Sequence, residues 1–521
     1  MSMKKKQITS NNNTNEAFST NEKTFFHFIL SKENRIWFIL SCLVGIVYFF
    51  ISNKLFPFPN LYPDSYTYIE CANKNILVNF RPVEYSKFII FFKQFSATHT
   101  ALIIAQYAFF LISNLFLFLT LLYTLKMSKL AKYALFTFLF INPIYILTSN
   151  AVLSDPFFSS IAVIWVTVLI WLLLKPHLLL FVLQLIATLF LFKLRYHGII
   201  FPVLFTITCF FIPYNNWLKT LFVALNVVAL FFIVKETTDI NEDQTYTRTF
   251  SAFSGWQMAN NALYVLQNKE VSIDTTAFDK LDNNRFKDFA VYLKTYLDTV
   301  KNPIASKLVN GAYIWNEASP LKKYLLVYLR KHEKEFFVDA NNQISYFEIW
   351  QLMGPIYSKV GQEVIMQHPA IYFKNFIKPN IAAYFNSDLE AYQEYCTNKD
   401  TIQSSVTDYY HYSNIKIEKK SKETYKTLIA PFPRLFLFSN ILFYISLIVY
   451  LVVFWKKWNP VFIKILALFI LLYLINLGFI SLLAPTVFRY HIFIFTLLFP
   501  ISLYMIDAIV LKFLSNKKAP Q

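Results

Sequence analysis

Long uncharged apolar runs constrain this chain more than any other feature, and "IWFILSCLVGIVYFFIS" (36–52) is the first of them. In helical conformation a run of this length crosses a hydrocarbon core about 30 Å thick. Comparable runs recur along the 521 residues, and only 15% of the chain is charged, whereas about a quarter of a soluble globular domain is charged. The sequence therefore predicts an all-α polytopic membrane protein.

Apolar segments predict about ten transmembrane helices. They lie at 35–53, 99–125, 131–148, 153–174, 177–194, 197–213, 217–235, 433–455, 459–479 and 488–511. The polar, Lys-rich residues 1–34 lack the apolar core of a signal peptide and predict a disordered cytoplasmic tail. The remaining parts are a transmembrane module (35–235) with its first outer loop (54–98), a polar insertion (236–432), the last three helices (433–512) and a second cytoplasmic tail (513–521).

Lysines in the short loops orient these helices. The loops that hold Lys126, Lys175, Lys219 and Lys456 contain no acidic residue, so the positive-inside rule makes them cytoplasmic. Both termini are then cytoplasmic and the insertion faces outward. Because acids and bases nearly balance in the insertion, the net charge of +18 belongs to the membrane part. This distribution fits anchoring against anionic lipid rather than nucleic-acid binding.

The insertion contains enough apolar and aromatic residues to fold as a mostly helical domain outside the membrane. "FSGWQMANNALYVL" (253–266) and "YFEIWQLMGPIYSKV" (346–360) show helical periodicity. Trp256, Trp315 and Trp350 fit either a packed core or a platform on which sugars stack, and core packing is the favoured interpretation. A domain in this place would hang over any outward cavity and could recognise an acceptor there.

Charged residues of the membrane part gather at one level. Of its eight acidic residues, Asp64, Glu70, Glu84 and Asp155 all fall at the predicted outer boundary. Two basic clusters, "FKLRYHG" (192–198) and "FRYHIFIF" (488–495), reach the same boundary. Ionisable groups at this depth are costly unless they line a polar cavity. We therefore expect one outward-facing cavity that these side chains share.

Two kinds of chemistry are combined there. Arginine binds phosphate oxygens bidentately, so Arg195 and Arg489, with the neighbouring His197 and His491, suit a lipid phosphate. A carboxylate suits a different task, either accepting a proton from a hydroxyl or holding a divalent metal. Asp64 and Asp155 are the candidates for these two roles.

Simpler interpretations stand beside these. Asp64 also fits a helix N-cap, and Thr67 with Glu70 has the spacing of a capping box, with Glu70 as its acid. Asp155 precedes Pro156, which fits the first turn of a helix. The arginines also fit side chains that extend to lipid headgroups.

The cysteines and the absence of several sequence motifs limit which kinds of site the chain can contain. Cys71 and Cys396 both fall in predicted outer segments, where a disulfide and two free thiols both fit the sequence. Cys42 and Cys209 lie in apolar segments, where we expect their side chains to pack against apolar neighbours. The chain has no HExxH, Walker or Rossmann glycine pattern.

Five stretches carry a resemblance to a known family. They are "YPDSYTYIECA" (62–72), "FRPVEYSKFIIFF" (80–92), "NPIYILTSNAVLSDPFFSSIAVIW" (142–165), "LRYHGIIFP" (194–202) and "FRYHIFIFTLLFP" (488–500). Together they resemble the polyprenyl-phosphate-sugar-dependent glycosyltransferases of the GT-C superfamily, of the dolichyl-phosphate-mannose and aminoarabinose transferase type. The resemblance covers about residues 35–235 and 430–510 and leaves the insertion out.

The resemblance implies roles for five residues. Asp64 matches the first-loop acid, which acts as catalytic base, and Asp155 matches a second-loop acid associated with acceptor or metal binding. Arg81, Arg195 and Arg489 match basic positions near the donor phosphate. A divalent metal, Mg or Mn, at Asp155 stays an open option.

This chain departs from the family pattern at two places. Ser65 follows Asp64 where many members have a second acid, and "PVEY" (82–85) stands where "PGYP" is usual. Both differences leave metal dependence and the substrate open.

The implied activity is transfer of a sugar from a polyprenyl-phosphate donor to an acceptor hydroxyl, with inversion, at the outer side of a bacterial inner membrane. The acceptor is a glycan, a lipid or a protein. One rival is a transporter or flippase of lipid-linked saccharides, which predicts polar residues in mid-span and broken helices in paired halves. Another is a non-catalytic scaffold whose insertion binds a partner.

Overall fold

The computed structural model describes residues 24–268, 271–279, 284–299, 312–332, 346–484 and 486–518. Helices make up the regular structure of these ranges, which contain isolated β-bridges but no β-strand. The all-α prediction is confirmed for this part of the chain.

Eight helical segments of the described residues are long and apolar enough to cross a membrane. They are Lys32–Leu55 (α2), Thr100–Thr124 (α5), Lys129–Ser149 (α6, η2 and α7), Asp155–Leu174 (α8), Asn216–Thr245 (α11), Lys419–Val453 (α21 and α22), Pro460–Leu483 (α23) and Phe488–Ser515 (η8 and most of α24). Two shorter apolar helices, Leu178–Leu194 (α9) and Tyr196–Cys209 (η3 and α10), coincide with the predicted fifth and sixth segments. The multi-pass character is confirmed, and the total of about ten spans stays a prediction.

One of these segments is interrupted for a clear local reason. Between α6 (Lys129–Phe136) and α7 (Pro143–Ser149) the backbone widens into a π-helix, Thr137–Ile141. Pro143 has no N–H to donate to the preceding turn. The side chain of Asn142 caps the new helix by accepting from the N–H of Ile144 at 3.1 Å.

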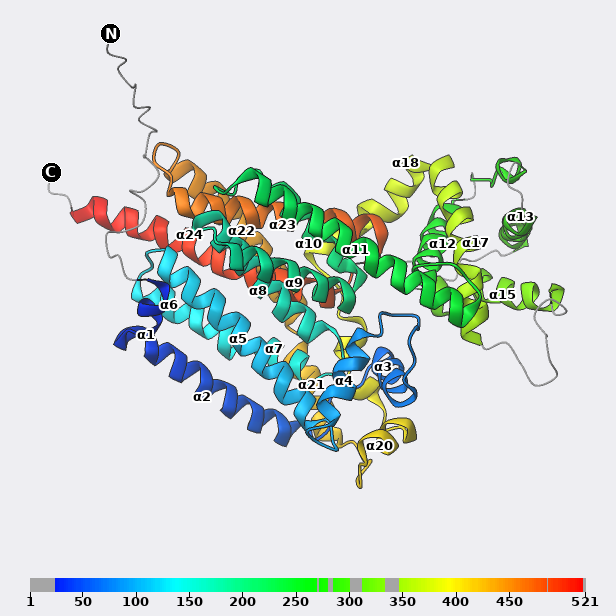
Figure 1. Cartoon of the computed structure of the whole chain (residues 1–521), viewed down its shortest axis with the longest axis horizontal. Helices are drawn as coiled ribbons and strands as arrows, with labels where there is room; N and C mark the ends of the chain where they lie inside the picture. Colours follow the sequence, from blue (N-terminus) through cyan, green and yellow to red (C-terminus); the bar gives the residue numbers. More distant parts are fainter. Residues whose placement is uncertain are drawn as a thin grey trace, which may run out of the picture.

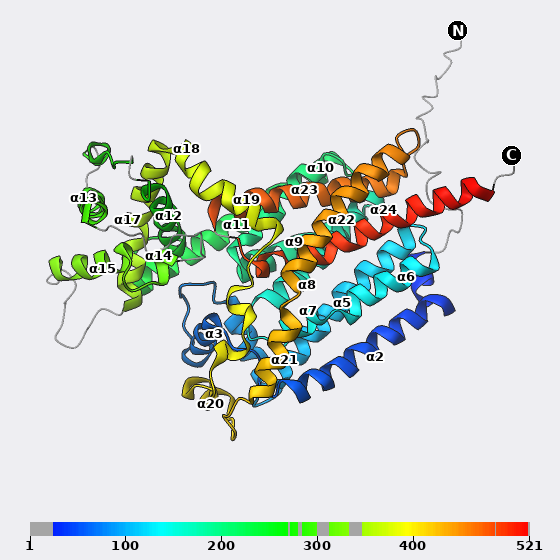
Figure 2. The same ribbon diagram turned by 180° about the vertical axis from the view of Figure 1, so that it is seen from behind.

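The apolar segments form an elongated bundle of helices that run side by side (Figure 1; Figure 2). α8 lies in its interior, with almost all of its side chains buried, and packs against α5 and α9. α1 (Phe25–Leu30) and the end of α24 (Ile492–Lys518) lie at one end of the bundle, while α3, α4, α20 and the helices from α12 to α18 lie at the opposite end.

Both predicted tails differ from the structure. α1 and the start of α2 occupy residues assigned to the first tail, and α24 continues to Lys518 rather than ending near 512. Hydropathy marks where an apolar segment stops, but a helical backbone continues into polar surroundings when nothing breaks it. The rest of the tails, residues 1–23 and 519–521, lies outside the described residues.

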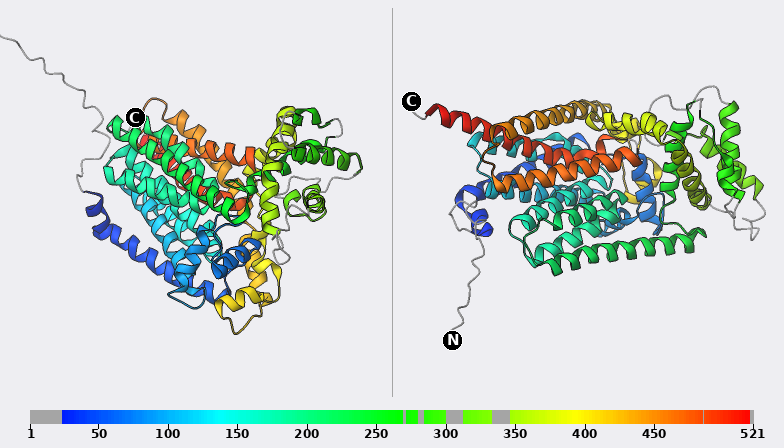
Figure 3. Two further views of the ribbon diagram at one scale, coloured as in Figure 1. Left: turned by 45° about the vertical axis from the view of Figure 1, so that its right-hand side comes forward. Right: turned by 90° about the horizontal axis from the view of Figure 1, so that it is seen from above.

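The predicted insertion divides into two parts. α11 (Asn216–Thr245) first extends past residue 235 and leads out of the bundle (Figure 3). The described residues between 252 and 377 then form a hydrophobic core of their own. Their helical elements are α12 (Ala252–Leu266), η4 (Thr275–Phe278), α13 (Asn284–Thr299), α14 (Ala312–Trp315), α15 (Pro320–Lys331), α17 (Tyr346–Gln367), α18 (Pro369–Tyr372) and η5 (Phe373–Ile377).

The centre of this domain is the crossing of α12 and α17. The rings of Trp256 and Trp350 stack there at 4.9 Å, and both side chains are buried, as predicted. Gly255 makes the crossing close, because a Cβ atom on it would lie 1.9 Å from the carbonyl oxygen of Gly354.

Residues 378–430 instead belong to the core of the membrane helices. Their elements are α19 (Lys378–Phe385), η6 (Glu390–Gln393), η7 (Tyr395–Asn398), α20 (Ser404–Tyr410) and α21 (Lys419–Ile429). The hydroxyls of Tyr62 and Tyr425 lie 2.7 Å apart, and the backbone N–H of Cys396 donates to Asn60 at 2.6 Å. This second part therefore packs on the first loop and holds it in place.

All four cysteines are free thiols. The Sγ of Cys71 accepts a hydrogen bond from Asn79 at 3.1 Å, and the thiol of Cys396 donates to the carbonyl of Pro59 at 3.6 Å. The disulfide option between Cys71 and Cys396 is therefore not realised in this structure.

Candidate active site

Asp64 lies in the first turn of α3 (Pro63–Lys74), not ahead of it. Tyr62 is the N-cap residue, and its N–H donates to the hydroxyl of Ser65 at 2.9 Å. Pro63 has its φ angle preset for the first helical position, so the helix begins there. The capping box predicted at Thr67 and Glu70 is therefore wrong.

Glu70 is an exposed residue of the same helix. Its carboxylate pairs with Lys74 at 2.7 Å, one turn further along α3. It has no part in starting the helix. The N-cap interpretation of Asp64 is wrong for the same reason, because Tyr62 holds that position.

Two arginines hold the carboxylate of Asp64, which is only 7% exposed. Its Oδ1 lies 2.7 Å from Nη2 of Arg81, in the loop before α4 (Glu84–Lys93). Its Oδ2 accepts from Nη2 of Arg489 at 2.8 Å, in η8 (Phe488–His491). Burial by itself raises the pKa of Asp64, but Arg81 and then Arg489 outweigh it and hold the pKa below its ordinary value. Asp64 is therefore ionised at neutral pH.

Asp155 forms a second, deeper pair. It opens α8 after the N-cap Ser154, in agreement with the predicted helix start, and its Oδ1 forms an ion pair with Arg195. Nε of Arg489 lies 3.9 Å from the same oxygen, so Arg489 stands between the two carboxylates. Oδ2 of Asp155 is buried without a hydrogen-bond partner among the described residues.

A tight turn places Arg195 there. The chain passes from α9 into η3 (Tyr196–Ile199) with Arg195 in an extended conformation. Gly198 packs directly on the end of α9, where a Cβ atom would lie 2.6 Å from the carbonyl carbon of Leu191. The sequence "LRYHG" therefore turns back sharply and leaves the guanidinium facing Asp155.

The ion pairs join five charged side chains into one cluster. Asp64 and Asp155 contribute two negative charges, and Arg81, Arg195 and Arg489 contribute three positive charges, which leaves a net charge of +1. Such a cluster attracts an anion. It also explains how the two carboxylates are buried, since each has at least one guanidinium partner.

The cluster lies on the wall of a cavity of about 730 Å³. Asp64, Arg81, Arg195 and Arg489 all line it, so the predicted convergence of these four residues is found in the structure. Asp155 is not among the lining residues and lies behind the arginines that it pairs with. Most of the remaining wall is apolar, with Phe80, Phe253, Met258, Trp315, Phe479, Ile480 and Leu483.

The two predicted histidines take different positions. His197 lines the cavity, and its Nε2 lies 2.8 Å from Oδ1 of Asn476. His491 is fully buried beside the rings of Tyr384 and Phe436, at 4.3 and 5.3 Å between ring centroids. It does not line the cavity, because η8 turns Arg489 toward Asp64 and His491 toward the helix core.

The divalent metal at Asp155 stays a prediction. The described ranges contain no group of three or more His, Cys, Asp or Glu side chains that could hold one. Both site carboxylates are neutralised by arginines, and the cluster as a whole is positive. As it stands, the cluster is suited to an anion.

Core packing, the interpretation favoured from the sequence for all three tryptophans, is wrong for Trp315. Trp315 is 44% exposed and lines the cavity, in contrast to the packed Trp256 and Trp350. The ring of Tyr490 lies 5.0 Å from the guanidinium of Arg195 and 5.5 Å from that of Arg489. The only signal for Tyr490 in the sequence is its place beside Arg489.

Comparisons of the chain with protein-family models, with curated proteins and with solved structures find no match. The site itself is thus the basis for assigning a function.

Proposed function

We propose that the protein is an integral membrane glycosyltransferase that uses a polyprenyl-phosphate sugar as donor. The observation that carries this proposal is an ionised carboxylate, Asp64, set in a cationic cluster on the wall of a large, mostly apolar cavity. A lipid-linked donor has the same two parts, an apolar chain and an anionic phosphate. The resemblance of the five sequence stretches to the GT-C superfamily points to the same activity.

The arginines differ in how firmly they are held. Arg489 pairs with both carboxylates and Arg195 with Asp155, and their side chains are 12% and 13% exposed. Arg81 is 24% exposed, and its ion pair is with Asp64. It also lies in a loop rather than a helix. Arg81 is therefore the guanidinium that most readily turns to a donor phosphate.

Donor binding would then prepare the base. When Arg81 moves from Asp64 to the phosphate, Oδ1 of Asp64 is released and the basicity of the carboxylate rises. The acceptor hydroxyl donates to this oxygen and its own oxygen attacks the anomeric carbon. The bond from that carbon to the phosphate oxygen breaks, the proton passes to Asp64, and the arginines stabilise the departing phosphate.

One displacement of this kind inverts the anomeric centre. The leaving phosphate is a stable anion, so a second carboxyl group is not needed to protonate it, unlike in ordinary glycosidases. Asp155 acts in this scheme as a positioning residue for Arg195 and Arg489. The cavity lies at the end of the bundle opposite to α1 and the end of α24, which supports an outward site with both termini cytoplasmic.

The test is transfer by the full chain in lipid vesicles that contain undecaprenyl-phosphate glucose or undecaprenyl-phosphate mannose. Release of undecaprenyl phosphate is followed by mass spectrometry, with a membrane extract as the source of acceptor. Asp64→Asn should abolish release. Glu70→Gln is the matched control, because Glu70 lies on the same helix and is exposed away from the cavity.

Undiminished release by Asp64→Asn would overturn the proposal. A flippase of lipid-linked saccharide is the alternative, and it would move the donor across the bilayer without breaking the sugar–phosphate bond. Transport needs no proton acceptor. The alternative would be favoured if the unmodified chain moved the donor across the bilayer without transferring its sugar, and if Asp64→Asn moved it equally well.

A further inference from the structure

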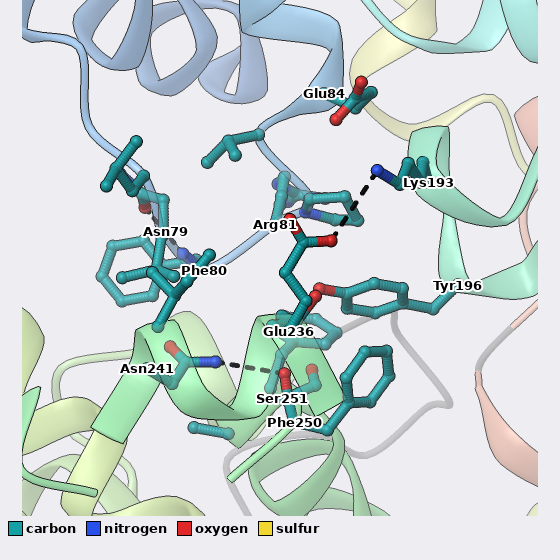
Figure 4. A pocket seen from close by; sticks show the side chains of 18 of the residues that line it. Asn79, Phe80, Arg81, Glu84, Lys193, Tyr196, Glu236, Asn241, Phe250 and Ser251 are labelled. Atoms are coloured by element: carbon teal, nitrogen blue, oxygen red, sulfur yellow. Dashed lines mark hydrogen bonds and ion pairs between the residues drawn. The ribbon is translucent and has the colours of Figure 1, made fainter. Parts of the chain in front are cut away.

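A second, smaller pocket adjoins the cavity (Figure 4). Its volume is about 80 Å³, and it shares the segment Phe80–Pro82 with the cavity wall. Arg81 thus lines both hollows, and its partner Asp64 lies 2.7 Å away on the cavity side. The pocket and the cavity therefore meet at the proposed base.

Separate parts of the chain build this pocket. The first outer loop contributes Arg81 and Glu84, the end of α9 contributes Lys193, and the extension of α11 beyond the bundle contributes Glu236 and Asn241. Gln351 of α17 reaches it from the 252–377 domain. The pocket thus exists only because α11 continues past the membrane part and meets that domain.

Its charged side chains are all held in ion pairs. Lys193 faces Glu236 at 3.9 Å, as Figure 4 shows, and Lys87 pairs with Glu84 at 3.0 Å. Arg81 pairs with Asp64 on the cavity side. The pocket therefore offers a ligand hydrogen-bonding groups rather than an unpaired charge.

Two buried amide oxygens in this pocket have no partner among the described residues. Asn241 donates through Nδ2 to the carbonyls of Thr249 and Phe250 at 2.9 and 3.2 Å, but its Oδ1 accepts nothing. The Oε1 of Gln351 is also buried and unpartnered. Buried acceptors are destabilising when left unpaired. Two of them in the lining of one pocket call for a ligand that can donate hydrogen bonds.

We propose that this pocket binds the hydroxyl-bearing edge of a neutral sugar that belongs to the acceptor. Neighbouring hydroxyls of one sugar ring supply the missing donors to Asn241 and Gln351. The volume has room for a few groups of the size of a water molecule, which matches one edge of a ring rather than a whole oligosaccharide. The inference rests on the proposed function and names its acceptor as a carbohydrate.

The experiment measures sugar binding without any donor or turnover. The full chain in lipid nanodiscs is titrated with methyl β-D-glucoside, methyl β-D-galactoside and methyl α-D-mannoside, and binding is followed by saturation-transfer NMR. At least one glycoside should bind. Asn241→Leu and Gln351→Met should each weaken that binding about tenfold, the effect of losing one well-placed hydrogen bond. Two variants on different helices guard against a local folding defect in either.

Asn226→Leu is the matched control. Asn226 lies on the same helix α11, is equally buried and also has an unpartnered Oδ1, while its Nδ2 donates to the carbonyl of Phe222 at 2.7 Å. It does not line the pocket. Glycoside binding by this variant should equal that of the unmodified chain.

Three outcomes would overturn the inference: no glycoside binds, both pocket variants bind as the unmodified chain does, or Asn226→Leu loses binding to the same degree. The result is separate from that for the proposed function. Glycoside binding with no transfer would support the sugar-binding pocket and contradict the proposed transferase activity. Transfer without glycoside binding would support the activity and contradict the pocket.

Discussion

Arg489 donates a 2.8 Å hydrogen bond to Asp64, 425 residues earlier in the chain. The same guanidinium lies 3.9 Å from Asp155 through its Nε. One side chain from the last helical segment thus joins the first loop to the start of α8. The proposed base is held in place by residues that come together only when the bundle closes.

Replacing Arg489 should lower stability strongly. Arg489→Gln leaves two buried carboxylates with one guanidinium fewer, and breaking a buried ion pair from one side is expected to lower the free energy of unfolding by about 3–5 kcal/mol. Thermal unfolding in detergent measures this change. Arg434→Gln, at an exposed position of α22 (Phe432–Val453), is the control and should change little. Equal unfolding temperatures for the two variants would contradict a structural role for the cluster.

The contribution of Asp64 to stability should depend on pH in a way that its arginine partners set. Its pKa in the folded protein lies below the unfolded value of about 3.9. The ionised carboxylate therefore stabilises the protein above that pH, and this contribution is lost as the pH falls through the folded pKa. Removing Arg81 raises the folded pKa toward the unfolded one, so in Arg81→Gln this contribution is smaller and stability declines less on acidification.

Unfolding temperatures measured between pH 3 and pH 7 test this shift, with Glu70→Gln as the control. The acid limb of any transfer activity should move to higher pH. A stability profile of Arg81→Gln that falls as much on acidification as that of the unmodified chain would contradict the ion pair between Arg81 and Asp64.

Gly255 should not tolerate a side chain. In Gly255→Ala the new Cβ would lie 1.9 Å from the carbonyl of Gly354, so α12 and α17 must separate, which typically costs about 1–3 kcal/mol or more. Limited proteolysis of the 252–377 domain reports this loosening. Gly478→Ala in α23 is the matched control, because no atom lies within 4 Å of its Cβ position. If Gly255→Ala resisted the protease as well as Gly478→Ala does, the close contact between α12 and α17 would be contradicted.

The four cysteines should all react as free thiols. Maleimide labelling of the denatured, unreduced chain should add four labels, one to each of Cys42, Cys71, Cys209 and Cys396. Reductant should then leave the unfolding temperature unchanged. A total of two labels that rises to four after reduction would reveal a disulfide between Cys71 and Cys396.

Much of the architecture could be predicted from the sequence because hydropathy acts locally. The apolar runs correspond to helices of the bundle, and the helical character of 253–266 and 346–360 follows from their periodicity. Helix ends were less predictable. α3 begins at Pro63 rather than Thr67, since Ser65 provides the reciprocal hydrogen bond that Glu70 was expected to make.

The sequence by itself determined that this chain is a multi-pass helical protein and that Asp64, Arg195 and Arg489 lie near one end of its helices. Tertiary structure alone decided how these charges pair, because ion pairs between distant segments depend on helix packing and leave no pattern along the chain. It placed Asp155 behind the arginines and His491 in the core, since residues two apart in a helix, such as Arg489 and His491, point to different sides. It also brought Asn241 and Gln351 into one pocket, because only folding decides which buried polar groups lie together.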